Sequence, residues 1–114
     1  MKKKKKILIL GGAGFIGFYL AKELVEKNSI IIIDDLSKNN GKIDKGLKNL
    51  ISKKNIKFIN KNISNIDTKS FPNNFDYIFD LAATLGVKKV IKNSFSTLKN
   101  NLRLSLKAIE IAKK

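Results

Sequence analysis

Four glycines between residues 11 and 17 constrain the fold of this chain more than any other feature of its sequence. They follow an uninterrupted apolar run at residues 7–10, which is typical of a parallel strand buried on both faces. From residue 14 to residue 27 the apolar side chains recur at helical spacing, so the glycines fall in a strand-to-helix turn. An anion can approach the N-terminus of such a helix only where no Cβ intervenes. The turn therefore predicts an α/β fold with an anion site at the start of its first helix.

The rest of the chain continues the alternation of strands and helices. We expect further strands at 30–33, 56–59 and 76–81, a loop at 37–46, a short helix at 47–51 and a long helix at 95–112. This order is typical of a Rossmann-like, doubly wound parallel sheet, here truncated to about four strands. The long helix is apolar on two sides, with Leu104, Ala108 and Ile111 on one and Leu98, Leu102, Leu106 and Ile109 on the other. A helix of this kind is expected to be buried on two sides.

The spacing of the glycines indicates what the anion is. Gly11, Gly14 and Gly17 form a GxxGxxG variant of the dinucleotide-binding motif, and Phe18 stands where a P-loop requires lysine. Asp34 ends the second predicted strand, where a carboxylate accepts hydrogen bonds from the ribose hydroxyls and repels a 2′-phosphate. The alternatives are a simple tight turn and an aspartate that caps a helix or lies in a solvated loop. The arrangement favours binding of NAD over NADP.

The residue types that are missing exclude several kinds of chemistry. The chain has no cysteine and no histidine. It therefore has no disulfide framework, no thiolate metal site and no Ser-His-Asp or Cys-His catalytic group. We expect no metal site.

The charge of the chain allows two interpretations. A net charge of +15 is typical of proteins that bind nucleic acid or anionic membranes. Arg103 is the only arginine, however, and apart from residues 2–6 the lysines are scattered, which favours a solvated surface. The lysines before the uncharged stretch 7–21 also suggest a signal peptide, but glycines interrupt that stretch and no small-x-small cleavage site follows it. We expect a cytoplasmic protein with no nucleic-acid and no membrane partner.

Three short runs carry a resemblance to a known family. Gly-Gly-Ala-Gly-Phe-Ile-Gly at 11–17, Asp-Asp-Leu-Ser at 34–37 and Phe-Asp-Leu-Ala-Ala at 79–83 resemble the extended short-chain dehydrogenases/reductases. More narrowly, the chain looks like the NAD-dependent epimerase/dehydratase family, which modifies nucleotide sugars. The resemblance implies an NAD(P)-binding Rossmann-like domain over residues 1–114 that is incomplete at its C-terminus and corresponds to the first third or so of a full member. In the intact enzyme it implies transient oxidation of a sugar hydroxyl by bound NAD, a nucleotide-sugar substrate and a homodimer in which the last helix takes part.

The resemblance also implies roles for particular residues. Gly11, Gly14, Phe15, Ile16 and Gly17 would hold the pyrophosphate, and Asp34 would hold the adenosine ribose with Asp35, Leu36 and Ser37 around it. Asn62 and Ile63 match a pair whose acid receives the adenine amino group, for which the asparagine keeps a carbonyl acceptor. Leu81, Ala82 and Ala83 would line the cofactor, and Asn101 matches an asparagine of the family's helix. The family usually has histidine at Asp80, proline at Ser94 and glycine at Leu104.

The catalytic residues of the family have no counterpart here. The family uses a Ser or Thr and a Tyr-x-x-x-Lys pair, but Tyr19 is followed four residues later by Glu23 and Tyr77 by Leu81. We therefore expect the NAD-binding N-terminal part of a nucleotide-sugar epimerase or dehydratase, inactive as this fragment and without catalytic residues. One alternative is a non-catalytic NAD-binding regulatory module. Another is a basic protein that binds nucleic acid or a membrane surface. In the usual strand order the fourth strand also lies beside a fifth, so we expect an unpaired apolar edge and oligomers or poor solubility.

Overall fold

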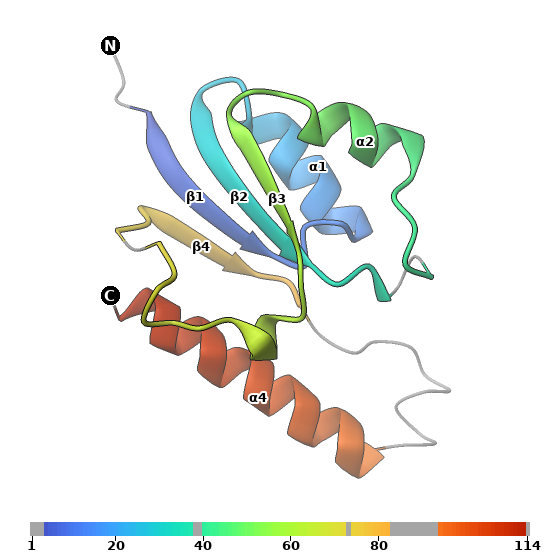
Figure 1. Cartoon of the computed structure of the whole chain (residues 1–114), viewed down its shortest axis with the longest axis vertical. Helices are drawn as coiled ribbons and strands as arrows, with labels where there is room; N and C mark the ends of the chain where they lie inside the picture. The colour runs from blue at the N-terminus through green and yellow to red at the C-terminus, as the bar shows by residue number, and fades with distance from the viewer. Residues whose placement is uncertain (1–3, 38–39, 73, 83–93, 114) are drawn as a thin grey trace.

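The computed structural model describes residues 4–37, 40–72, 74–82 and 94–113, which form one parallel sheet with helices on both faces (Figure 1). The strands are β1 (Lys5–Leu10), β2 (Asn28–Asp34), β3 (Ile56–Asn60) and β4 (Tyr77–Asp80), in the order β3-β2-β1-β4. The helices are α1 (Phe15–Leu24), α2 (Lys45–Ile51), the short 3-10 helix η2 (Ile63–Asn65) and α4 (Ser94–Ala112). The predicted Rossmann-like class, with about four parallel strands, is confirmed.

The apolar runs of the central strands supply two cores, one on each face of the sheet. Alternate residues of β1 point to opposite faces, so Ile7 and Ile9 pack towards α1 and α2, whereas Leu8 and Leu10 pack towards η2 and α4. The four side chains are at most 3% exposed. Burial of each contributes about 1.5 to 3 kcal/mol to folding. The apolar run at the end of β1 is stable here because both faces of the sheet are covered.

The ends of the helices differ from the sequence-based prediction in two places. Helix α2 begins at Lys45 rather than at residue 47, because the Asp44 carboxylate accepts a hydrogen bond from the Leu47 N–H at 2.8 Å and caps the helix earlier. Helix α1 ends at Leu24 rather than at residue 27. The 3-10 helix η2 was not predicted, since three residues are too few to show a periodic pattern.

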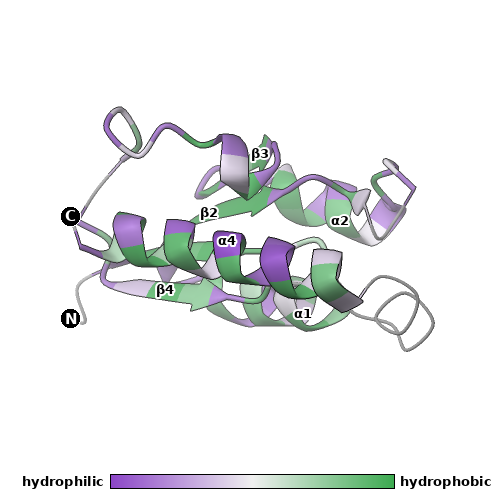
Figure 2. Cartoon of the chain, turned by 90° about the horizontal axis from the view of Figure 1, so that it is seen from below, coloured by the Kyte–Doolittle hydropathy of each residue, from purple (hydrophilic) through white to green (hydrophobic). Residues whose placement is uncertain are grey.

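Helix α4 is apolar on two sides, as predicted, and only one of them is covered by the described residues. Leu104, Ala108 and Ile111 are buried against the sheet and η2. The opposite side is exposed: Phe95 79%, Leu98 70%, Leu102 58%, Leu106 52% and Ile109 51%. Figure 2, which views the chain from the side of this helix, shows hydrophobic bands along its whole length. A large apolar surface therefore faces solvent in this chain.

Strand β4 lies at the edge of the sheet. It pairs with β1 through Tyr77 to Asp80, and within the described part of the chain no strand lies on its other side. The predicted unpaired edge is thus observed for these residues. No helix in the described ranges combines the length and the apolar character needed to cross a bilayer.

Candidate functional site

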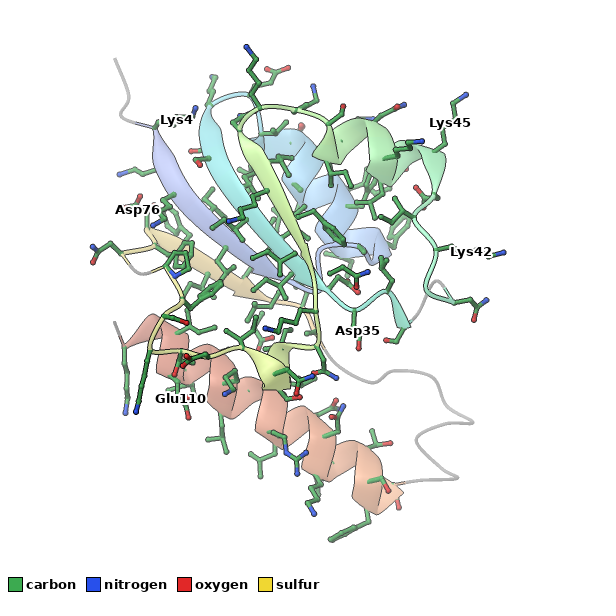
Figure 3. All side chains as sticks on the ribbon, in the orientation of Figure 1. Lys4, Asp35, Lys42, Lys45, Asp76 and Glu110 are labelled. Carbon is green, nitrogen blue, oxygen red and sulfur yellow. The ribbon has the colours of Figure 1, made fainter. Side chains whose placement is uncertain are left out.

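A cleft lies at the carboxyl ends of the strands, which is where open α/β sheets bind their ligands. Its walls come from every strand end and from α4: Gly11, Gly14, Asp34, Asp35, Ser37, Lys61, Asn62, Ile63, Leu81, Ala82, Asn100 and Leu104. Figure 3 shows Asp35 at this end of the sheet and Lys4 at the opposite end. The labelled Lys42 and Lys45 project outward from the segment that leads into α2, away from Lys4 (Figure 3).

Two glycines of the turn are required by the fold itself. Gly11 has a φ of +84°, and a Cβ there would lie 2.9 Å from the backbone nitrogen of Ala82. A Cβ on Gly17 would lie 2.6 Å from the Cα of Gly12, because α1 crosses the turn at close range. Both contacts are with backbone atoms, which cannot move aside as a side chain can. A larger residue at either position would displace β4 or α1.

Gly14 is different, because no contact with the described residues requires a glycine there. A Cβ on Gly14 would meet only the Gly11 carbonyl oxygen at 3.6 Å, an ordinary contact, and its φ of −73° suits any residue. Gly14 is the N-cap of α1, makes no side-chain capping hydrogen bond, and is followed by no acidic residue in the first turn. Since Gly14 also lines the cleft, the missing Cβ leaves space beside helix N–H groups that lack a side-chain acceptor. This space fits the pyrophosphate of a dinucleotide.

Asp34 links the glycine turn to the loop that follows β2. Its Oδ2 accepts a hydrogen bond from the Ala13 N–H at 3.0 Å, and its Oδ1 accepts one from the Leu36 N–H at 2.7 Å. Each carboxylate oxygen has a second lone pair with which it can accept from a ribose hydroxyl. Asp34 therefore has two roles in the structure: it accepts the hydrogen bonds that organise both loops, and it lines the cleft.

The segment after β3 forms the third wall. The Lys61 N–H donates to the Asp34 carbonyl oxygen at 3.1 Å, which continues the pairing of β3 with β2 by one residue. Asn62 is the N-cap of η2, and its Oδ1 accepts hydrogen bonds from the Ser64 N–H at 2.9 Å and the Ser64 hydroxyl at 2.7 Å. Ile63 is buried in the core beneath.

The structure brings most of the expected residues together around the cleft. Those that line it are Gly11, Gly14, Asp34, Asp35, Ser37, Asn62, Ile63, Leu81 and Ala82. Leu36 is buried and reaches the site through its N–H bond to Asp34. Gly17 lies beneath the turn, Phe15 and Ile16 expose their side chains on α1, and Asn101 is not part of the wall. Ala83 lies outside the described residues.

Three lining residues were missed from the sequence. Lys61 precedes Asn62, and its place in the wall follows from the extra β3–β2 hydrogen bond. Asn100 and Leu104 are four residues apart on α4, so they share a face that Asn101 does not. The helical spacing of 100 and 104 was the available signal.

Asp80 is the one described group whose acidity is clearly altered. Partial burial at the end of β4 raises the pKa of its carboxyl above the ordinary value of 3.8, and a hydrogen bond with the Ala82 backbone opposes that rise. No group of three or more acidic side chains suited to a metal ion occurs in the part of the chain that the structure describes.

The parallel sheet, the glycine turn after β1 and the carboxylate that ends β2 define a Rossmann-like α/β protein with its cleft at the topological switch point. The chain belongs to the NAD dependent epimerase/dehydratase family, whose model matches residues 7–114.

Sequence relatives support this assignment. The chain is 37% identical over 99 residues to a UDP-N-acetyl-alpha-D-glucosaminuronate decarboxylase of Bacillus cytotoxicus. The matched region covers 86% of this chain and 30% of that protein. It is also 41% identical over 95 residues to the uncharacterized UDP-glucose epimerase YtcB of Bacillus subtilis. That matched region covers 79% of this chain and 30% of that protein.

Solved structures show the same fold. A UDP-N-acetylglucosamine 4-epimerase from Methanobrevibacter ruminantium, in complex with UDP-N-acetylmuramic acid, superposes with a TM-score of 0.81 at 31% identity, over 95% of this chain and 34% of that one. A UDP-glucuronic acid 4-epimerase from Bacillus cereus, in complex with UDP-glucuronic acid and NAD, has a TM-score of 0.80 at 26% identity, over 93% of this chain and 35% of that one. The chain thus spans about a third of the length of the relatives it matches.

Proposed function

We propose that this chain binds NAD in the cleft, through the pyrophosphate and the adenosine, and forms the NAD-binding part of an enzyme that modifies a nucleotide sugar. Membership of the NAD dependent epimerase/dehydratase family supports this proposal. The Bacillus cereus relative in complex with UDP-glucuronic acid and NAD supports both the cofactor and the class of substrate.

The space at Gly14 is the observation that carries the proposal. The fold leaves room for a side chain at this position, yet the sequence keeps a glycine where the N-terminus of α1 meets the cleft. A ligand that needs close backbone approach and carries negative charge accounts for that choice. The Asp34 carboxylate, in the same cleft, favours a free ribose over a 2′-phosphate and hence NAD over NADP.

The residues of this chain bind and orient the cofactor. When bound, NAD would accept a hydride from the carbon of a sugar hydroxyl and later return it. The first turn of α1 would hold the pyrophosphate, Asp34 would position the ribose, and Ile63, Leu81 and Ala82 would provide apolar contacts. Neither Tyr19 nor Tyr77 is followed four residues later by a lysine, as the Tyr-x-x-x-Lys pair of the family requires. We therefore assign neither proton transfer nor turnover of the sugar to any of the described residues.

Calorimetric titration of the chain with NAD tests the proposal. We expect binding by the wild-type chain and a loss of at least tenfold in affinity in Gly14→Val, whose side chain would occupy the pyrophosphate space. Asn49→Val, which introduces the same side chain at an exposed position of α2 outside the cleft, is the matched control and should bind as the wild type does. Thermal unfolding of each variant checks that it is folded. A folded wild-type chain that does not bind NAD would refute the proposal, and so would a Gly14→Val variant of unchanged affinity.

A further inference from the structure

The loop that follows Asp34 contains a reactive dipeptide. Asn40 and Gly41 form the one Asn-Gly pair of the sequence, and both residues are exposed. The backbone nitrogen of a glycine that follows asparagine can attack the asparagine side chain, because no Cβ on the glycine hinders its approach. The proposed function gives this pair no role, although Asp35 and Ser37 of the same loop line the cleft.

This reaction needs water and neither an oxidant nor a reductant. The Gly41 nitrogen loses its proton and forms a bond to the Cγ of Asn40, and the Cγ–Nδ2 bond breaks with release of ammonia. One water molecule then opens the cyclic imide at either of its carbonyl carbons, which leaves an aspartate or an isoaspartate in place of Asn40. The net change replaces an amide by a carboxyl, so the loop gains a negative charge.

In the folded chain the attacking nitrogen is already engaged. The Gly41 N–H donates a hydrogen bond to the Leu36 carbonyl oxygen at 2.9 Å. Gly41 has a φ of +75° and Asn40 a φ of +53°, both in the left-handed region. The nitrogen must give up the proton that it shares with Leu36 before it can attack Asn40, so this hydrogen bond has to break first.

Asp34 holds the acceptor of that hydrogen bond in place. Leu36 has a φ of +63°, which is rare for a leucine, and it is only 2% exposed. Its N–H donates to the Asp34 Oδ1 at 2.7 Å, so the carboxylate and the burial of the side chain together keep Leu36 in this conformation. The residue proposed to position the ribose therefore also restrains the nitrogen of Gly41.

We propose that Asn40 is a site of spontaneous deamidation, and that the hydrogen bonds from Asp34 through Leu36 to Gly41 set its rate. The reaction proceeds from a locally open state, in which the bond between Leu36 and Gly41 is broken while the rest of the chain stays folded. Given the proposed function, NAD bound at Asp34 favours the closed state and slows the reaction. The rate of deamidation thus measures how often this loop opens.

Peptide mapping by mass spectrometry at mildly alkaline pH follows the conversion of Asn40. The free peptide of residues 34–46, in the same buffer, is the unfolded reference. We expect the folded wild-type chain to react at least about tenfold more slowly than the peptide, the factor that one hydrogen bond supplies. NAD at about a hundred times its dissociation constant should slow the folded chain by at least about tenfold more. Equal rates in the folded chain and the peptide would overturn the proposal.

Two variants separate opening of this loop from unfolding of the whole chain. Asp34→Ala removes the acceptor of the Leu36 N–H and should speed the reaction by about threefold or more. Ile111→Val shortens a buried side chain of α4 that lies outside the loop and the cleft, and should leave the rate unchanged. Circular dichroism checks that both variants are folded. An equal acceleration in the two variants, or none in Asp34→Ala, would refute the role of these hydrogen bonds.

Calorimetry shows independently whether NAD binds to the chain. If it does not bind, the proposed function fails, and the comparisons with the peptide and between the variants still decide the proposal for Asn40. If NAD binds and the rate stays the same, the link between the cleft and this loop is refuted while the proposed function stands.

Discussion

The Ala13 N–H donates to the Oδ2 of Asp34 over 3.0 Å, and this bond joins the glycine turn after β1 to the end of β2. The second carboxylate oxygen receives the Leu36 N–H at 2.7 Å. Two loops that are separate in the sequence therefore share one partly buried carboxylate. The residue expected to orient the ribose also sets the shape of the turn expected to hold the pyrophosphate.

Asp34→Ala should weaken both the fold and the binding of NAD. It removes the acceptor of two partly buried hydrogen bonds, and we expect a loss of about 2 kcal/mol in the free energy of unfolding. Urea unfolding measures the stability, and calorimetry should show NAD affinity reduced at least tenfold. Asp35→Ala is the control for stability, because the exposed Asp35 accepts only the Ser37 N–H at 3.0 Å and its replacement should cost less than about 0.5 kcal/mol. An equal loss of unfolding free energy in the two variants would contradict the role given to Asp34.

Asp80 should make the chain less stable as the pH rises above the acidic range. Burial raises the pKa of this carboxyl in the folded state, so the unfolded chain loses the proton first as the pH rises past about 3.8. The stability associated with the neutral form is fully present below that value and is lost as the pH rises through the folded-state pKa. Asp80→Asn removes the titration. The difference in unfolding free energy between the variant and the wild type should therefore be smallest below the ordinary pKa, grow in favour of the variant as the pH rises, and level off once the pH exceeds the folded-state pKa.

Urea unfolding at a series of pH values checks the Asp80 prediction, with Asn49→Ala at an exposed position without a titrating side chain as the control. A difference between Asp80→Asn and the wild type that is flat across pH would contradict it.

The two apolar sides of α4 should respond differently to the same substitution. Leu104 is 8% exposed and packs in the core, so Leu104→Ala should lower the free energy of unfolding by about 2 to 4 kcal/mol. Leu102 is 58% exposed, and Leu102→Ala should stay within about 0.5 kcal/mol of the wild type. Urea unfolding at low protein concentration measures both. Similar losses would show that the exposed side is covered in solution.

The exposed side of α4 should also govern self-association. We expect the wild-type chain to form oligomers at micromolar concentration, because a continuous apolar surface on α4 and the free edge of β4 both favour contact between copies. The double substitution Leu102→Lys and Leu106→Lys should shift the mass measured by light scattering towards the monomer. Substitution of two exposed polar residues, Lys45→Gln and Lys48→Gln on α2, is the control. A wild-type chain that remains a dilute monomer would contradict this prediction.

The order of elements could be read from the sequence because it depends on local patterns. The short, glycine- or acid-bounded apolar runs at 7–10 and 30–33 favour strands covered on both faces, and the two apolar sides of α4 follow from helical spacing. The cleft residues next to a strand end, such as Asp34, could be predicted for the same reason. Leu104 was assigned correctly to the core side of α4, but its place in the cleft depends on how α4 crosses the strand ends.

What could not be predicted depends on contacts between side chains and backbone. Asn62 caps the three residues of η2, and its side-chain oxygen accepts a hydrogen bond from the Ser64 N–H. The sequence Asn-Ile-Ser alone does not show this hydrogen bond. The hydrogen bond from the Ala13 N–H to Asp34 likewise depends on how β1 and β2 lie relative to one another. In both cases the sequence predicts that the residue belongs to the cleft, but not which of its atoms are already used in hydrogen bonds within the protein.

The cleft takes its walls from residues as far apart in the sequence as Gly11 and Leu104, and this distribution couples ligand binding to folding. No short segment of the chain contains the whole site, so an unfolded or partly folded chain has almost no affinity for the dinucleotide. Ligand at a hundred times its dissociation constant would therefore raise the free energy of unfolding by about 2.7 kcal/mol through mass action alone. Under the proposed function, bound dinucleotide would thus stabilise the folded chain against unfolding.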